Sequence, residues 1–186
     1  MSSSKSILGQ LADIVLKALT SRTSRSPEKE TGRSSAPGTA RIREDSGAEQ
    51  GSETVRIDPE RIGHLRITYT PERDGAPDSG EVIWTWVPYE ENDGRGKDRP
   101  VLVIGRQSSD RVYAVRMTSK PHERDRDYLS IGSGGWDSQG RESWVDIEQL
   151  YSVHDAGMRR EAAILDRRRY DTVAGALVRR YGWAVR

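Results

Sequence analysis

Two apolar segments decide the fold, Val82-Ile83-Trp84-Thr85-Trp86-Val87 and Val101-Leu102-Val103-Ile104. The first is β-branched and aromatic throughout, which predicts a strand. The second is a continuous aliphatic run, which is typical of a strand buried on both faces. A polar loop over residues 90–98 separates them, and Asp110-Arg111 turns the chain into a third strand over 112–118. We therefore expect a β-rich domain built around these strands.

The chain after residue 118 adds shorter strands and one helix. Strand candidates lie at 128–131, 144–147, 150–153 and 162–165. Asp166 has the position of a helix N-cap, and apolar residues recur after it at helical spacing: Tyr170, Val173, Leu177 and Tyr181. Short strands separated by turns and followed by a helix predict a mainly β fold with a C-terminal helix, a small barrel rather than a doubly wound sheet.

The N-terminal part of the chain has a different character. Residues 1–20 carry apolar side chains at helical spacing and predict a short amphipathic helix. Residues 21–56 are rich in Ser, Arg, Glu, Gly and Pro, so they cannot bury enough apolar surface to offset the entropy of ordering, and we expect a disordered linker. Residues 57–77 regain apolar character as an extended lead-in segment. The barrel domain is then expected over 78–186.

Composition restricts the function classes. Hydrophobic residues make up 33% and charged residues 32% of the 186, which fits a modest core with a polar tail. The absence of cysteine excludes disulfides, thiolate metal ligands and cysteine nucleophiles, and it favours the cytoplasm. No apolar run approaches the ~20 residues that span a bilayer, so we expect no membrane span.

Three familiar chemical motifs are incomplete. The turn Gly132-Ser133-Gly134-Gly135 lacks the Lys-Ser/Thr pair that a P-loop needs. A Gly-x-Ser-x-Gly nucleophile elbow is not present in the sequence. Four residues of metal-binding type occur close together but alternate with Arg124 and Arg126, which would repel a cation: His122, Glu123, Asp125 and Asp127. We expect neither a metal nor another cofactor.

The ends of two neighbouring strands carry the most informative polar residues. Arg99 precedes the buried strand 101–104, and Thr118 ends the next strand. Strands joined by a short turn run antiparallel, so the start of one lies beside the end of the other. With the ammonium group of Lys120, these side chains form a suitable receptor for a phosphodiester. The spacing alone leaves open whether they are simply polar strand ends.

Four segments resemble, in order and spacing, the PemK/MazF family of toxins from toxin–antitoxin systems. The resemblance covers about residues 78–183 and is carried by Gly80-Glu81-Val82-Ile83-Trp84, Arg99-Pro100-Val101-Leu102-Val103-Ile104, Met117-Thr118-Ser119-Lys120 and Glu148-Gln149-Leu150. Before the second strand the chain reads Arg95-Gly96-Lys97-Asp98-Arg99-Pro100, where family members often carry Glu-Gln-x-x-x-Arg-Pro.

The resemblance implies a five-to-seven-stranded SH3-like barrel, a homodimer that cleaves single-stranded RNA without a metal. The catalytic arginine of the family falls on Arg99 and the catalytic threonine on Thr118. RNA contacts are expected from Lys97, Ser119, Lys120, His122 and Tyr89. The implied partners are single-stranded RNA, a cognate antitoxin protein and a second copy of the chain, with DNA left open as a further partner through a toxin–antitoxin complex.

Two other classes of function stay open. A non-catalytic barrel would bind a protein partner, either an antitoxin or a topoisomerase-like target, and would need only an exposed apolar groove. A DNA-binding repressor would need a basic face, for which the arginines at 167–169 are the support. A ribonuclease instead requires that Arg99 and Thr118 converge on one phosphate. The general base of such an enzyme is not evident, and His122 is the nearest candidate in sequence.

Overall fold

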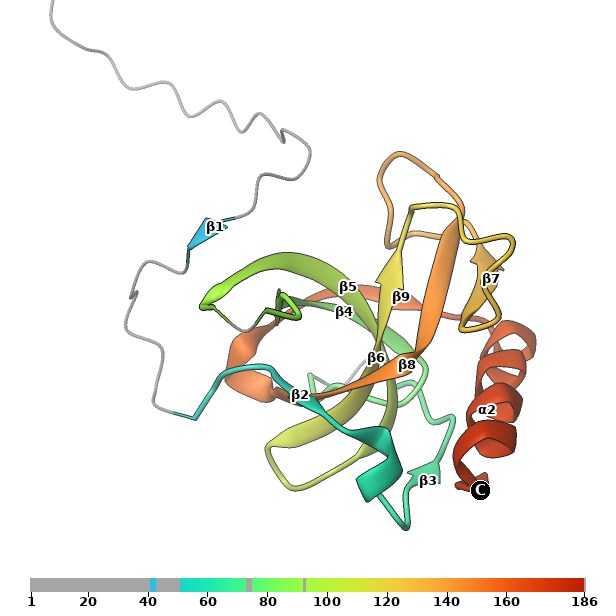
Figure 1. The fold of residues 1–186 in the computed structure, drawn as a ribbon, viewed down its shortest axis with the longest axis horizontal. Coiled ribbons are helices and arrows are strands. Elements are labelled where there is room, and N and C mark those ends of the chain that lie inside the picture. The colour runs from blue at the N-terminus through green and yellow to red at the C-terminus, as the bar shows by residue number, and fades with distance from the viewer. Residues whose placement is uncertain (1–40, 43–50, 73–74, 92, 186) are drawn as a thin grey trace, which may run out of the picture. The chain divides into compact units, whose positions relative to one another are not determined.

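The protein is mainly β with one C-terminal helix, as predicted (Figure 1). The predicted helix of residues 1–20 and the predicted linker up to residue 50, apart from one short strand, lie outside the described residues. In the part of the chain that is described, no helix is long and apolar enough to cross a membrane. The computed structural model describes residues 41–42, 51–72, 75–91 and 93–185.

One sheet contains most of the strands. Its hydrogen-bonded order is β2-β8-β6-β5-β4-β9, and in addition β7 pairs with β8 and β1 pairs with β5. Strands β3 and β10 form a separate parallel pair. The strands are β1 (Arg41–Ile42), β2 (Val55–Ile57), β3 (Arg66–Ile67), β4 (Glu81–Pro88), β5 (Arg95–Arg106), β6 (Arg111–Thr118), β7 (Tyr128–Gly132), β8 (Ser143–His154), β9 (Met158–Ile164) and β10 (Ala184–Val185). The helical elements of the described ranges are η2 (Pro59–Arg61), η3 (Asp155–Gly157) and α2 (Arg167–Tyr181).

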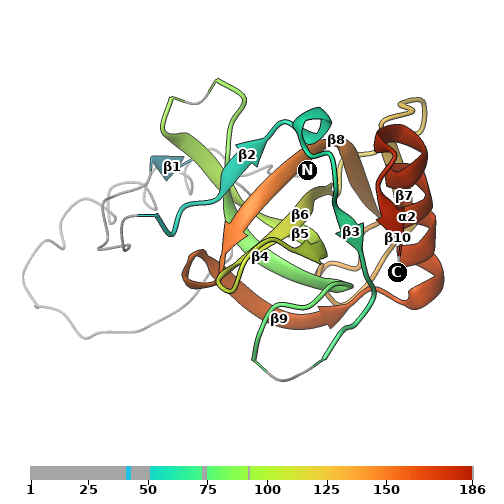
Figure 2. The same cartoon turned by 90° about the horizontal axis from the view of Figure 1, so that it is seen from below.

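The expected barrel is a curved sheet whose ladder stays open between β2 and β9 (Figures 1 and 2). Side chains connect its two ends. The Thr54 and Thr85 hydroxyl oxygens lie 2.6 Å apart, and Thr85 Oγ1 donates to the Gly157 carbonyl at 2.9 Å. Because the Thr85 proton is used there, Thr54 is the donor of the first bond. The segment before β2 is thereby held against β4.

The two faces of the sheet carry separate hydrophobic cores. One face packs against α2 and the lead-in segment, and we call it the helix face. The other face, called the inner face below, carries Ile83, Val87, Val101, Val103, Val112, Ala114, Tyr151 and Val153. Residues of β4 and β5 alternate between the two cores, with Val82 and Leu102 on the helix face and Ile83 and Val101 on the inner face.

Helix α2 begins and ends where its sequence requires. The Asp166 carboxylate accepts from the Arg169 backbone N–H at 3.1 Å, which confirms the predicted N-cap. Gly182 adopts a left-handed φ of 71° and its N–H donates to the Val178 carbonyl, which stops the helix. The predicted apolar stripe is buried against the sheet at Tyr170, Val173 and Leu177, and Tyr181 is half-buried.

The boundary between linker and domain differs from the expectation. Residues 51–57 were expected to be mostly linker, yet β2 pairs with β8 and Thr54 is only 9% exposed. The Arg111 guanidinium donates to the carbonyl oxygens of Gly51 and Glu53, both at 2.7 Å. The groups that fix this segment are hydroxyls and backbone carbonyls, so hydrophobic patterning could not reveal it.

The lead-in segment also contributes to the core, since Leu65 and Ile67 are almost completely buried. Two strand predictions change as well. Strand β5 begins at Arg95, inside the expected loop 90–98, because its pairing with β4 extends to Pro88 opposite Gly96. The expected strands 144–147 and 150–153 are parts of the single strand β8.

Removing the chain up to residue 50 should leave the free energy of unfolding within about 1 kcal/mol of the full chain, because Ser52 is the first buried residue of the described ranges and the removed strand β1 pairs with β5 over two residues. Removing it up to residue 62 should cost roughly 2–4 kcal/mol, because β2, the Thr54–Thr85 bond and the Ile62 carbonyl that accepts from Trp183 are then lost. Urea unfolding measures both values. Equal stability of the two truncated chains would contradict a structural role for β2.

Candidate functional site

The sheet register brings Arg99 and Thr118 to neighbouring positions. Val101 pairs with Arg116 in the β5–β6 ladder. One step further along the same face are Arg99 on β5 and Thr118 at the end of β6. Arg99 also pairs with Thr85 of β4, so it lies on the inner face, beyond the apolar core. The two predicted catalytic residues therefore occupy adjacent strands at the same end of the sheet.

Arg99 is half-buried and has no ion-pair partner among the residues that the structure describes. Its Nε is buried and has no hydrogen-bond acceptor. Burial lowers the pKa of Arg99, and the nearby Arg116 guanidinium lowers it further, while Tyr89 opposes the shift. Buried donors are nearly always satisfied in folded proteins. A guanidinium with an unused donor beside a second cation is a favourable site for an anion.

Further cations surround this position. Lys97 lies two residues before Arg99 and on the same face. Burial lowers the pKa of Lys97, and so do the charges of Arg99, Lys120 and Arg141. The charged groups that shift this pKa are thus all cations. We call Lys97, Arg99, Lys120 and Arg141 the cationic cluster.

Thr118 and Ser119 lie at the edge of the cationic cluster. The Thr118 hydroxyl oxygen accepts from the Lys120 backbone N–H at 3.2 Å, which folds the turn after β6 back on the strand end. Its hydroxyl proton is not used by that bond and can be donated to a ligand. Ser119 is half-buried in the same turn.

A second arginine, which the sequence did not single out, lies beside Arg99. Arg116 donates from Nη2 to Asp146 at 2.6 Å and to the Tyr128 hydroxyl at 2.9 Å. Asp146 is only 1% exposed. Burial alone would lower the pKa of Arg116, but the Asp146 carboxylate reverses the shift and the pKa is raised. The sequence indicates a buried charge here, because Arg116 lies within an otherwise apolar strand. It does not indicate the partner, because Asp146 lies on another strand.

His122 reaches the site through Tyr128. The two rings stack at 3.6 Å with an interplanar angle of 5°, and His122 Nδ1 lies 3.7 Å from Asp125. Burial raises the pKa of Tyr128, whose hydroxyl is held by Arg116. In the described ranges of the chain, no three His, Asp or Glu side chains are arranged to hold a metal ion. Asp127 is instead paired with Arg180.

The loop between β4 and β5 borders the site on the other side. Tyr89 is half-buried, and its proximity raises the pKa of Arg99 against the effect of burial. Glu90 accepts from the Gln149 amide at 2.7 Å, and Gln149 in turn accepts from the Tyr151 hydroxyl at 2.5 Å. This chain of hydrogen bonds fastens the loop to β8. Trp84 lies on the opposite face of β4, with Arg159 over its ring at 6.0 Å.

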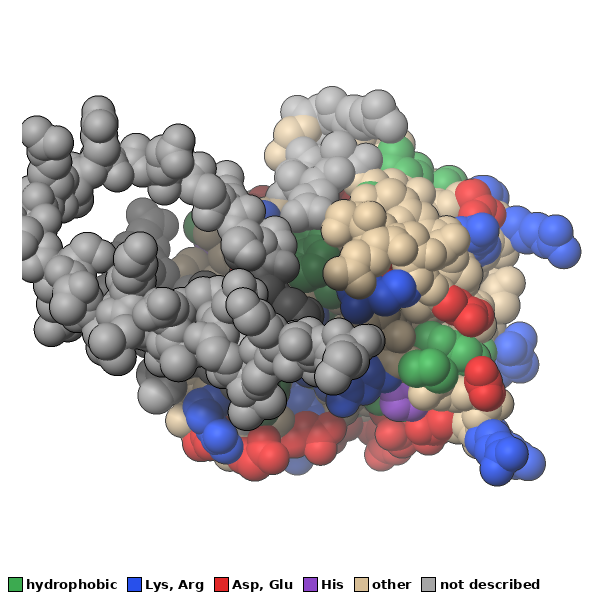
Figure 3. Space-filling view, turned by 90° about the horizontal axis from the view of Figure 1, so that it is seen from above, with side chains coloured by type: hydrophobic (Ala, Val, Ile, Leu, Met, Phe, Trp, Pro, Cys, Tyr) green, Lys and Arg blue, Asp and Glu red, His purple; other side chains and the backbone are tan. Residues whose placement is uncertain are grey.

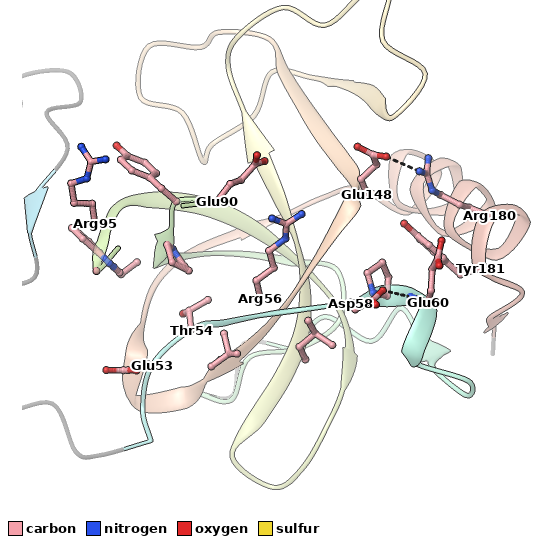
Figure 4. Close-up of a pocket in the computed structure, with 17 residues that line it drawn as sticks. Glu53, Thr54, Arg56, Asp58, Glu60, Glu90, Arg95, Glu148, Arg180 and Tyr181 are labelled. Atoms are coloured by element: carbon pink, nitrogen blue, oxygen red, sulfur yellow. Dashed lines mark hydrogen bonds and ion pairs between the residues drawn. The ribbon is translucent and has the colours of Figure 1, made fainter. Parts of the chain in front are cut away.

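A cavity of about 790 Å3 opens between this loop and the segment of β2 and η2 (Figure 4). Its walls carry cations, carboxylates and aromatic rings from distant parts of the chain. Its lining includes Arg56, Asp58, Tyr89, Glu90, Glu148 and Arg180.

Two of the three arginines at the start of α2, Arg167 and Arg169, are paired within the domain. Arg167 pairs with Asp171 at 2.8 Å and Arg169 with Asp166 at 3.0 Å. On the face seen in Figure 3, Lys and Arg side chains alternate with Asp and Glu side chains. These pairs leave little support for a uniformly basic DNA-binding face at this helix.

The family model for the PemK-like, MazF-like toxin of type II toxin–antitoxin systems matches residues 78–179. The chain belongs to this family. The matched range contains β4 to β9 and most of α2, and with them the cationic cluster. It does not include β2 or the lead-in segment. No curated protein matches the chain.

Three solved structures are similar to this chain. An endoribonuclease in complex with its cognate antitoxin from a mycobacterial species is 16% identical, with a TM-score of 0.45 over 57% of this chain and 96% of that one. MazE–MazF from Deinococcus radiodurans is 18% identical with a TM-score of 0.44, and MazF from the same organism is 18% identical with a TM-score of 0.45. Both cover 57% of this chain and 96% of their own.

Replacing Asp146 by Ala should cost about 3–5 kcal/mol of unfolding free energy, because it leaves the Arg116 charge buried without a partner. Asp127→Ala is the matched control, since it breaks a more exposed pair with Arg180 and should cost no more than about 1 kcal/mol. Guanidinium unfolding of both variants measures the difference. Equal costs would show that the Arg116–Asp146 pair is not a structural anchor.

Proposed function

We propose that this protein is the toxin of a type II toxin–antitoxin system and acts as a metal-independent endoribonuclease on single-stranded RNA. The observation that supports it most strongly is the cationic cluster, in which Arg99 is half-buried with an unused donor among other positive charges. Family membership supplies the class of protein, and the cluster supplies a receptor for a phosphodiester.

The reaction that fits this receptor is internal transesterification. The ribose 2′-oxygen attacks the adjacent phosphorus, the bond from phosphorus to the 5′-oxygen breaks, and the 2′-hydroxyl proton passes to a base. The 5′-oxygen takes up a proton, which gives a 2′,3′-cyclic phosphate and a 5′-hydroxyl.

In this scheme Arg99 stabilises the negative charge that develops on the phosphorane. The lowered pKa of Arg99 also makes it a better proton donor to the leaving oxygen than an exposed arginine. Thr118 donates its hydroxyl proton to a non-bridging oxygen, since its oxygen is already held by Lys120 N–H. His122 is the next candidate for a proton-transfer group.

The remaining RNA contacts follow from charge and ring position. Lys97 and Lys120 bind phosphates next to the scissile one, and Ser119 hydrogen-bonds the backbone. Tyr89 and His122 offer rings for base stacking, which contributes about 1–3 kcal/mol per base in single-strand binding proteins. Tyr89 lies on the β4–β5 loop, and the His122 ring stacks on Tyr128. In this proposal the RNA passes between Tyr89 and His122.

The proposed partners follow from the family. The family is described as toxins of type II toxin–antitoxin systems, and one similar solved structure is described as an endoribonuclease in complex with its cognate antitoxin, so we propose a cognate antitoxin protein for this chain. A homodimer, contact with DNA through a toxin–antitoxin complex, and action in the cytoplasm belong to the same proposal.

Arg99→Ala and Thr118→Ala should each lower RNA cleavage by at least about 10²-fold, because each removes a group that stabilises the transition state. Arg99→Lys should also be impaired, since an ammonium keeps the charge but loses the planar fork. A matched control is Arg168→Ala, which removes an exposed arginine at the start of α2. Single-turnover cleavage of a long single-stranded RNA measures the rates, and circular dichroism checks the fold.

Two outcomes would revise the proposal. Full activity in either alanine variant would place the chemistry elsewhere, with His122 as the next residue to replace. Failure of the intact protein to cleave any RNA would favour a non-catalytic module that binds a protein partner.

A further inference from the structure

The strand β2 lies outside the residues that match the toxin family, yet it lines the cavity beside the β4–β5 loop. It pairs antiparallel with β8, with Arg56 opposite Tyr151. Directly opposite residues in a ladder project from the same face, so Arg56 shares the inner face with Tyr151. Tyr151 belongs to the same core as Val101, which follows Arg99 on that face of β5.

A second contact places β2 near Arg99 from the other direction. Thr54 precedes Arg56 by two residues and bonds the Thr85 hydroxyl at 2.6 Å. Thr85 is the residue of β4 that pairs with Arg99. Arg56 and Arg99 therefore border the same end of the inner face, one from β2 and the other from β5.

The surroundings of Arg56 leave its charge available. Figure 4 shows its side chain directed into the cavity, between Glu90 and Asp58. Arg56 is exposed and forms no ion pair within the described part of the chain. Burial raises the pKa of Tyr151. The positive charges of Arg116, Arg56 and Arg99 each lower this pKa, with Arg116 and Arg56 having the larger effects. The three guanidinium groups thus act on one hydroxyl.

Three carboxylates of the same cavity, those of Glu148, Asp58 and Glu90, have partners other than Arg56. Glu148 pairs with Arg180 at 2.9 Å. Asp58 pairs with Arg61 at 3.3 Å and accepts from the Glu60 backbone N–H at 3.0 Å. Glu90 accepts from the Gln149 amide. Three of the carboxylates that line the cavity therefore have partners of their own, and Glu53 and Glu60 complete its acidic side chains.

We propose that Arg56 binds the RNA phosphate next to the one held by Arg99, so that the segment before the family domain is part of the substrate groove. The inference rests on the proposed function for its ligand class. It assigns to β2 a binding role in addition to its structural one. Tyr89, on the opposite wall of the cavity, supplies a ring on which the base between the two phosphates can stack.

The test compares Arg56→Gln with Arg66→Gln in the full chain. Arg66 is an exposed arginine on β3, so the control removes the same charge away from the cavity. The probe is a mixed-sequence oligonucleotide in which every ribose is 2′-O-methylated, because it keeps the phosphates and cannot undergo internal transesterification. Fluorescence anisotropy over a range of salt concentrations gives the dissociation constant and its salt dependence.

Arg56→Gln should weaken binding by roughly five- to tenfold and should reduce the slope of log K against log salt by about 0.7, the value for one phosphate contact on a single strand. Arg66→Gln should change neither beyond twofold. Equal behaviour of the two variants, or no binding of the probe by the unaltered protein at low salt, would overturn the inference. Cleavage by the unaltered protein is measured separately on unmodified RNA. If Arg56→Gln weakens binding of the probe but the unaltered protein does not cleave RNA, the proposed nuclease is rejected while the phosphate contact of Arg56 is supported.

Discussion

The pairing of β5 with both β4 and β6 is the constraint on which the rest of the structure depends. Residues 101–105 of β5 are buried, and the part of the same strand that precedes them carries Lys97 and Arg99. Because side chains alternate along a strand, the register that buries Val101 on the inner face also directs Arg99 to that face. A shift by one residue would bury the wrong side chains and turn the cations away from the site.

The two neighbouring arginines differ in how their charges are compensated. Arg116 is held by Asp146 and Tyr128, so its pKa is raised and its role is structural. Arg99 loses water without gaining a carboxylate, and Arg116 lowers its pKa. The Arg116–Asp146 pair thus holds the Arg116 guanidinium beside Arg99 and does not supply Arg99 with a carboxylate. A phosphodiester would satisfy the donor of Arg99, and this is the physical reason for proposing RNA cleavage at this end of the sheet.

Much of this arrangement was predictable because it depends on local pattern. Asp166 as the N-cap of α2 follows from short-range rules, and the proximity of Arg99 and Thr118 follows from two strands joined by a turn. The Arg116–Asp146 pair was not predictable, since it joins β6 to β8 and no spacing rule connects them. The residues that begin β5 include Gly96, which disfavours a strand, and their pairing with β4 overrides that preference.

The segment of β2 was missed for a related reason: its attachment uses the Thr54 hydroxyl and backbone carbonyls rather than apolar side chains. The most direct measurement of the proposed chemistry is the identity of the RNA ends after incubation of the intact protein with a long single-stranded RNA in EDTA. Transesterification at the cationic cluster predicts continued cleavage, with 2′,3′-cyclic phosphate at one end and a 5′-hydroxyl at the other. Cleavage that stops in EDTA, or that leaves a 5′-phosphate, would contradict it.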